Sequence, residues 1–81
     1  MKANEATFFK SKFVHNGCRP LLSLGIQDIP ADEDYPAFTA VVAVTIFGEY
    51  YYFSPDEDVK EIDADMVEEA NRIKKDEYLF N

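Results

Sequence analysis

The chain has 81 residues, a formal net charge of −8 and 47% hydrophobic residues. A chain of this length forms a single domain, 1–81, and its apolar content is sufficient for a packed core, which excludes an intrinsically disordered protein. One cysteine excludes an internal disulfide, no apolar run reaches the roughly 20 residues that cross a bilayer, and the first residues lack the pattern of a secretion signal. We therefore expect a cytoplasmic protein.

The acidic residues are concentrated in the middle of the chain. Thirteen of the 16 carboxylates lie within 28–69, where Lys60 is the one basic residue. An electrostatic field of this sign repels nucleic acid and anionic membranes and attracts basic protein surfaces. We therefore expect no direct binding to nucleic acid or membrane, and a protein partner with a basic surface.

The first predicted element is a β-hairpin over 7–26. Residues 7–15 alternate with the period of a strand, and Asn16-Gly17 is the strongest short signal for a type I′ turn. A two-residue loop at this dipeptide would place Phe9 opposite Leu24. The register then predicts one core face and one mildly basic, solvated face.

The segment 27–37 is predicted to be a loop, because two prolines and a run of three acids disfavour a regular ladder. It has eleven residues, which exceeds the usual connection, and ordered long loops often carry binding residues. Asp32, Glu33 and Asp34 are therefore candidate partner-binding residues. The alternative is a solvated connection between two hairpins.

The second predicted hairpin covers 38–53, with Gly48-Glu49 as a type II′ turn that places Phe47 opposite Tyr50. This register leaves an apolar row with several tyrosines on the face that points away from the core. Rows of tyrosine are typical of protein interfaces, so self-association through this face, as a homodimer, is one prediction. The alternative is that these residue types simply favour strands. The candidate self-association residues are Val41, Phe47, Tyr50 and Tyr52.

The last predicted element is a C-terminal helix that begins at 54–57. This segment has a serine cap, a proline at the first helical position, early acids and a glutamate at the capping-box position. Apolar residues then recur at helical spacing as far as Ile73, which predicts an amphipathic helix to about Lys75. Asp63 and Asp65 have poor helix propensity, so the alternative is one capped turn followed by a second helix near Asp63.

A continuous helix would carry an acidic ridge. Like charges four residues apart destabilise a helix by about 0.2–0.5 kcal/mol per pair, so an uncompensated row of them suggests a binding role. A ladder of negative charge loosely resembles a nucleic-acid backbone, and such a DNA mimic could occupy the basic groove of a nucleic-acid-binding protein. The alternative is a solvated face that keeps the domain monomeric. The ridge residues are Glu57, Glu61, Asp65 and Glu69.

The familiar catalytic and cofactor motifs are missing from the sequence. It has no glycine-rich phosphate loop, no paired histidine metal motif and no paired cysteines. His15 and Cys18 face each other in the predicted hairpin, but a tight turn offers neither a pocket nor oxyanion donors. The carboxylates of 56–65 lack the glycine of a calcium loop. We expect no catalysis, no cofactor and no metal; an acid/base enzyme would instead need a carboxyl group in an apolar pocket.

These observations predict an α+β fold, in which two β-hairpins form an antiparallel four-stranded sheet and one C-terminal amphipathic helix packs on one face. The strand order remains open. The predicted function is that of a small acidic non-enzymatic binding protein, an inhibitor or regulator of a basic-surfaced, nucleic-acid-binding protein. Phages and other mobile elements use such domains against host defences. The alternative is a structural or oligomerising accessory protein.

Overall fold

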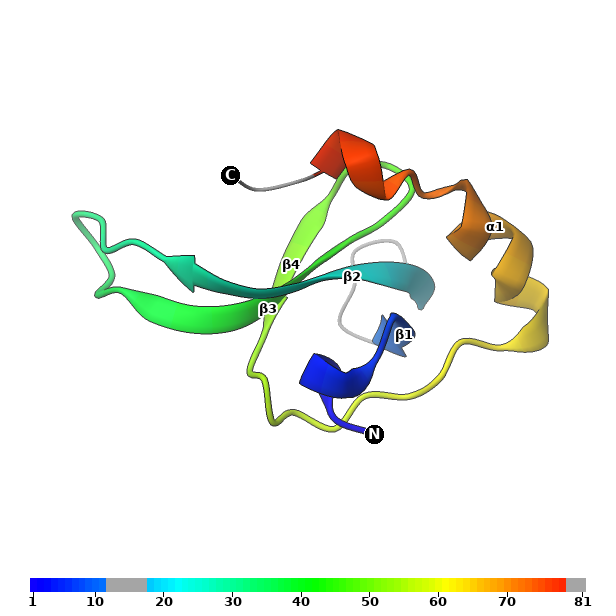
Figure 1. The fold of residues 1–81 in the computed structure, drawn as a ribbon, viewed down its shortest axis with the longest axis horizontal. Coiled ribbons are helices and arrows are strands. Elements are labelled where there is room, and N and C mark those ends of the chain that lie inside the picture. Colours follow the sequence, from blue (N-terminus) through cyan, green and yellow to red (C-terminus); the bar gives the residue numbers. More distant parts are fainter. Residues whose placement is uncertain (12–17, 79–81) are drawn as a thin grey trace.

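The fold is described by a computed structural model, which covers residues 1–11 and 18–78. Four strands form one antiparallel sheet in the order β1-β2-β3-β4. With one short α-helix added, the predicted α+β class is confirmed (Figure 1). No described helix is long and apolar enough to cross a membrane. The strands are β1 (Phe8–Ser11), β2 (Arg19–Ile29), β3 (Phe38–Val44) and β4 (Tyr50–Phe53); the helices are the 3-10 turns η1 (Ala3–Glu5), η2 (Ala64–Met66) and η3 (Lys75–Tyr78), and α1 (Val67–Arg72).

Both faces of the sheet are covered, each by a different end of the described chain (Figure 1). The first core cluster joins the N-terminal segment and the 54–63 segment to one face. The second joins the C-terminal segment to the other face, where Ile73 and Tyr78 pack. The first cluster contains Ala3, Ala6, Phe9, Leu21, Val41, Ala43, Phe53 and Val59, and the second contains Leu22, Leu24, Val42, Val44 and Ile73.

The predicted register of the first hairpin is wrong. Phe9 pairs with Leu21 instead of Leu24, and Ser11 pairs with Arg19. This register differs from the one that a two-residue loop at Asn16-Gly17 would give, and that dipeptide lies outside the described residues. Because side chains alternate between faces, a register change of three residues also exchanges the faces.

The second hairpin shows the same kind of difference, and its cause is visible. Val44 pairs with Tyr50, and the chain between them turns through Thr45 to Glu49 instead of a two-residue Gly48-Glu49 turn. The Gly48 N–H donates to the Thr45 carbonyl at 3.0 Å, and Gly48 has φ +79°. This is the arrangement of three-residue hairpin loops that use a glycine in the left-handed region. The predicted II′ turn is therefore wrong.

The predicted continuous helix from Pro55 to Lys75 is also wrong, and the alternative of a single turn and a later helix agrees with the structure. The Glu57 N–H donates to the Ser54 carbonyl at 3.0 Å, which closes one turn. The chain then stays extended, because its backbone pairs with the N-terminal segment and β1. Helical structure begins at Ala64. The bonds of the extended part are Ala3 N–H to Glu57 O (2.9 Å), Val59 N–H to Met1 O (2.8 Å) and Lys10 N–H to Lys60 O (2.9 Å).

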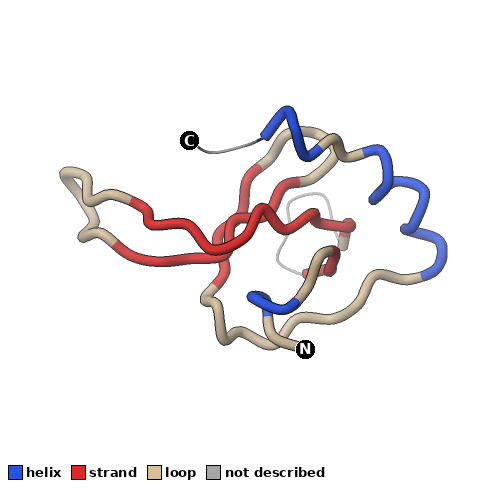
Figure 2. The backbone as a smooth tube through the Cα atoms, viewed as in Figure 1, coloured by secondary structure: helices blue, strands red, loops and turns tan. Residues whose placement is uncertain are grey.

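The second half of β2 and the first residues of β3 project from the body as a two-stranded arm (Figure 2). We define the arm as residues 26–41, including the loop 30–37. A register shift between Ser23 and Ile26 marks its base, where Gly25 has φ +90°. The arm contributes to the elongated shape of the molecule, whose principal extents are 40 × 26 × 23 Å. Strand β2 continues to Ile29, whereas the predicted loop began at residue 27; this predicted boundary is wrong.

Candidate partner-binding surfaces

The four residues of the predicted acidic ridge do not form one ridge. Glu57 and Glu61 lie in the 54–63 segment, which we call the extended segment, whereas Asp65 is in η2 and Glu69 is in α1. The comparison with a phosphate backbone depended on helical spacing, so the structure does not support a helical charge ladder. Glu57, Glu61 and Asp65 are individually exposed.

Several carboxylates near the ridge are neutralised by basic residues from distant parts of the chain. Three of the four ion pairs among the described residues join a basic residue of the N-terminal part to a carboxylate in 58–69. These pairs reduce the negative field around 58–69. Within residues 1–11 and 18–78 the pairs are Lys2–Asp58 (3.1 Å), Lys10–Asp63 (2.7 Å), Arg19–Glu69 (2.8 Å) and Arg72–Glu68 (2.9 Å).

Arg19 links three elements, and sequence reasoning missed this role. Its Nη1 donates to both carboxylate oxygens of Glu69, at 2.8 and 2.9 Å, which connects β2 to α1. Its guanidinium also lies 4.6 Å from the ring centroid of Phe47 in the β3–β4 turn, within the range of a cation–π contact. Glu69 therefore has a structural partner, and no sequence pattern connects residues 50 positions apart.

Two of the ion pairs each shift the pKa of one of their members. The hydrogen bond from Lys2, together with its charge, lowers the pKa of Asp58. The hydrogen bond to Asp63 raises the pKa of Lys10, and desolvation opposes this effect. Both pKa shifts favour the charged forms of Asp58 and Lys10.

The acidic loop of the arm is ordered by one of its own carboxylates. Asp32 Oδ1 accepts the N–H groups of Asp34 and Tyr35, both at 2.8 Å, and the Asp32 N–H donates to the Tyr35 carbonyl at 2.9 Å. This Asx-type turn makes Asp32 a structural residue of the loop. Glu33 and Asp34 are exposed at the tip, so the predicted loop residues divide into one that shapes the loop and two that face solvent.

The arm also lies within a long part of the chain that has no basic residue. Residues 20–59 contain no lysine, arginine or histidine but eight carboxylates. At the root of the loop, exposed Asp28 accepts a hydrogen bond from the Thr39 hydroxyl at 3.1 Å. None of the four carboxylates of the arm forms an ion pair with a described residue.

The predicted self-association face is not one surface. Val41 is 0% exposed and pairs with Phe53 in the first core cluster, on the opposite face from Tyr50 and Tyr52. This correction follows from the three-residue register difference of the second hairpin. Phe47 is 60% exposed in the turn, where its ring contacts Arg19.

Exposed aromatic side chains nevertheless lie together on the face of the sheet that holds the second core cluster, which we call the second face. Tyr52 is 53% exposed and packs edge-to-face on Phe38, with ring centroids 5.9 Å apart. Tyr50 makes a similar contact with Tyr78 at 6.0 Å. Phe38, which was not among the predicted interface residues, joins this aromatic surface to the acidic loop of the arm.

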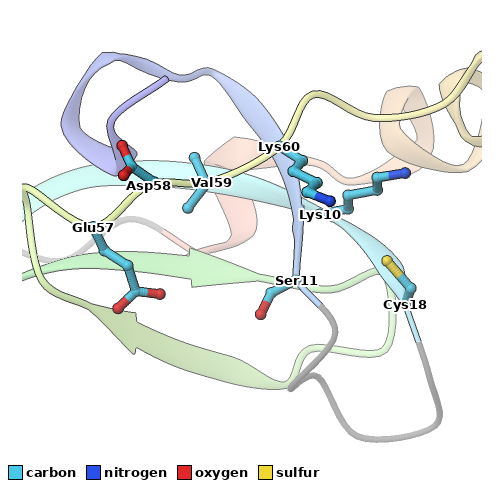
Figure 3. A pocket seen from close by; sticks show the side chains of 7 residues that line it. All are labelled: Lys10, Ser11, Cys18, Glu57, Asp58, Val59 and Lys60. Atoms are coloured by element: carbon cyan, nitrogen blue, oxygen red, sulfur yellow. The ribbon is translucent and has the colours of Figure 1, made fainter.

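A pocket of about 340 Å³ lies between the extended segment, the end of β1 and the start of β2 (Figure 3). Its lining mixes both signs of charge with one exposed thiol, and its lysine at position 10 is already paired with Asp63. The predicted proximity of His15 and Cys18 cannot be followed here, because His15 lies outside the described residues. No described group of three or more His, Cys, Asp or Glu side chains could hold a metal ion. The lining residues are Lys10, Ser11, Cys18, Glu57, Asp58, Val59 and Lys60.

Comparison with protein-family models, with curated proteins and with solved structures finds no match to this chain.

Proposed function

We propose that this chain is a small, acidic, non-enzymatic binding protein of the cytoplasm that inhibits or regulates a protein with a basic, nucleic-acid-binding surface. The contact is made by the arm, with Glu33 and Asp34 at its tip. The short C-terminal helix serves as an amphipathic cover of the sheet and takes no part in the contact. The observation that supports this proposal most is the projection of an ordered acidic loop from a stretch of 40 residues, 20–59, without a single cation.

The projection of the arm matters because the charges at its tip are far from the basic residues of the body. Opposite charges on two proteins attract each other over about one Debye length, which is roughly 8 Å at physiological salt. This attraction raises the association rate. Carboxylates that already pair with lysine or arginine contribute little to such a field. Glu33 and Asp34 have no ion pair with a described residue, whereas Asp58, Asp63 and Glu69 each have one.

The exposed acids of the extended segment and η2 form a second anionic surface. Glu57, Glu61 and Asp65 lie among the paired carboxylates of the 56–69 region, so their combined field is weaker than their number suggests. We assign them an auxiliary role. They also provide a matched comparison for the arm, because equal numbers of charges can be removed from either surface.

The proposal is tested by capturing partners from the native host at low salt, identifying the direct partner by mass spectrometry and measuring Kd with the purified pair. The double variant Glu33→Gln/Asp34→Asn is compared with Glu57→Gln/Glu61→Gln, since both change the net charge from −8 to −6. We expect the arm variant to weaken binding by about tenfold and the second variant by about twofold or less.

Binding should also weaken as ionic strength rises, and the protein should displace nucleic acid from its partner. An affinity that is equal at low and high salt would contradict the proposal. If the two double variants weakened binding equally, the arm would not be the specific binding site for the partner.

A second candidate function is that of an oligomerising accessory protein. The exposed aromatic residues of the second sheet face favour it, because an apolar patch on a sheet commonly marks an interface. With Val41 excluded by burial, its surface would consist of Phe38, Phe47, Tyr50 and Tyr52.

A further inference from the structure

The outer edge of β3 is open over the first three residues of the strand. Strand β4 pairs with β3 only from Val41 to Val44. Phe38, Thr39 and Ala40 pair with β2 on one side. On their other side, no strand in residues 1–11 or 18–78 pairs with them. Such an edge is a template for another extended chain.

The direction of the backbone groups at this edge follows from the turn. The Thr45 N–H donates to the Glu49 carbonyl at 3.0 Å, across to the β4 side of the hairpin. In an antiparallel ladder, successive residues direct their N–H and C=O groups to opposite neighbours. Odd-numbered residues of β3 therefore face the β4 side. Thr39 is the odd-numbered residue beyond the end of β4, so both of its backbone polar groups face the open edge.

The outer edge of β2 differs, because a bulge and local side-chain bonds interrupt it at the base of the arm. The Ser23 hydroxyl accepts the Gly25 N–H at 3.1 Å, and the Gln27 side-chain amide donates to the Leu24 carbonyl at 3.2 Å. Together with the register shift at this position, these bonds protect that edge in the way that bulges commonly do. The β3 edge from Phe38 to Ala40 has no register shift, so it is the more regular of the two edges for pairing.

Side chains on both sides of the open edge define what can bind there. One face offers the exposed Phe38–Tyr52 ring pair, and the other offers Asp28, which is held by the Thr39 hydroxyl. A groove of about 330 Å³ runs along this part of the arm, lined by Asp28, Ile29, Pro30, Ala37, Phe38 and Thr39. An added strand would direct alternate side chains to the rings and to the carboxylate.

We infer that the edge at Thr39 binds an extended basic segment of the partner protein as an additional antiparallel strand, an inference that rests on the proposed function. Backbone hydrogen bonds to Thr39 hold the segment, arginine or lysine side chains contact Asp28 and the acidic loop, and apolar or cationic side chains cover Phe38 and Tyr52. A second copy of this chain is the poorer occupant, because it would bring two net charges of −8 together.

The test uses a short capped peptide of alternating arginine and valine, titrated into the full chain and followed by the amide signals of 38–40 in NMR spectra. The variant Thr39→Pro removes the outward N–H and the hydroxyl bond to Asp28 but no β2–β3 backbone hydrogen bond, and edge strands tolerate proline in this orientation. Thr39→Val is the matched control, because it loses the hydroxyl bond to Asp28 and keeps the N–H. We expect Thr39→Pro to weaken peptide binding by about tenfold and Thr39→Val by about twofold or less.

A change in the peptide provides a test that does not depend on folding of the variant. The same sequence with a methyl group on every backbone nitrogen keeps its charge and has no N–H group on either edge with which to pair as a strand, so we expect it to bind at least several-fold more weakly. Equal binding of the two peptides, or of the two Thr39 variants, would overturn the strand-addition inference.

The charge variants separate this inference from the proposed function. If Glu33→Gln/Asp34→Asn and added salt still weaken peptide binding while the Thr39 variants are equal, the acidic arm remains a binding surface without strand addition. If neither charge nor salt matters, the proposed function itself fails. A dimer of the protein alone that Thr39→Pro dissociates would show that a second copy, and not a basic segment, occupies the edge.

Discussion

Thr45 is the residue on which the β3–β4 turn depends. Its side chain is 0% exposed, and its hydroxyl oxygen accepts the N–H groups of Phe47 and Glu49, each at 3.3 Å. Its backbone N–H and carbonyl also close the turn, through Glu49 and Gly48. Threonine therefore supplies side-chain and main-chain partners at the same point, and the turn begins at this residue.

We expect Thr45→Val to destabilise the fold by about 2 kcal/mol, because two turn N–H groups lose an acceptor inside a buried site. Thr45→Ser retains the oxygen and removes one methyl group, so it should cost about 1 kcal/mol or less. Urea unfolding followed by circular dichroism measures both differences. A valine variant as stable as the serine variant would show that the hydroxyl does not hold the turn.

The strands could be predicted from the sequence, but their register could not. Alternation and aromatic content identified the strands around Phe9, Leu22, Val42 and Tyr52, and the α+β class followed from them. The register was wrong because dipeptide rules consider only the central turn residues, whereas Thr45 adds side-chain acceptors outside them. The faces of the second hairpin changed with its register, and with them the predicted interface.

The helix prediction failed for a different physical reason. The signals at 54–57 do produce one turn, but Val59 is then buried in the first cluster while its N–H bonds to Met1. This competing partner lies at the other end of the sequence, so no local rule anticipates it. The like-charge spacing from Glu57 to Glu69 also opposed a continuous helix. Of the candidate site, the exposed loop acids could be predicted, whereas the open edge at Thr39 depends on where β4 ends.

The docking of the extended segment on the N-terminal segment should depend on pH through Asp58. Its pKa is lowered in the folded state by Lys2, so this pair stabilises the fold at pH values above the usual carboxyl pKa of about 3.9. That contribution is lost as pH falls through the folded pKa. We expect the stability difference between the wild type and Asp58→Asn to be constant from about pH 7 to 5 and to decrease as the pH falls below about 4.

The measurement is urea unfolding at each pH. Asp56→Asn is the control, because Asp56 is exposed nearby and forms no ion pair with a described residue. A stability difference for Asp58→Asn that persists unchanged at pH 2 would mean that the carboxylate charge is not its cause.

At the scale of the whole molecule, net charge and the exposed aromatic surface oppose each other in self-association. Eight net negative charges on a 9.3 kDa protein disfavour contact between copies at low salt. We expect sedimentation at low salt to give a monomer over a wide concentration range. A stable dimer that a Tyr52→Lys substitution dissociates would instead support the oligomerising function.

The position of the single cysteine makes the molecule convenient for distance measurement. Cys18 is exposed immediately before β2, and the arm begins toward the opposite end of that 11-residue strand. At the rise of a β-strand, the eight residues from Cys18 to the start of the arm span roughly 26 Å. A fluorophore attached to this thiol would therefore stay clear of a protein seated on the arm, and energy transfer to a labelled partner would report where along the molecule it sits.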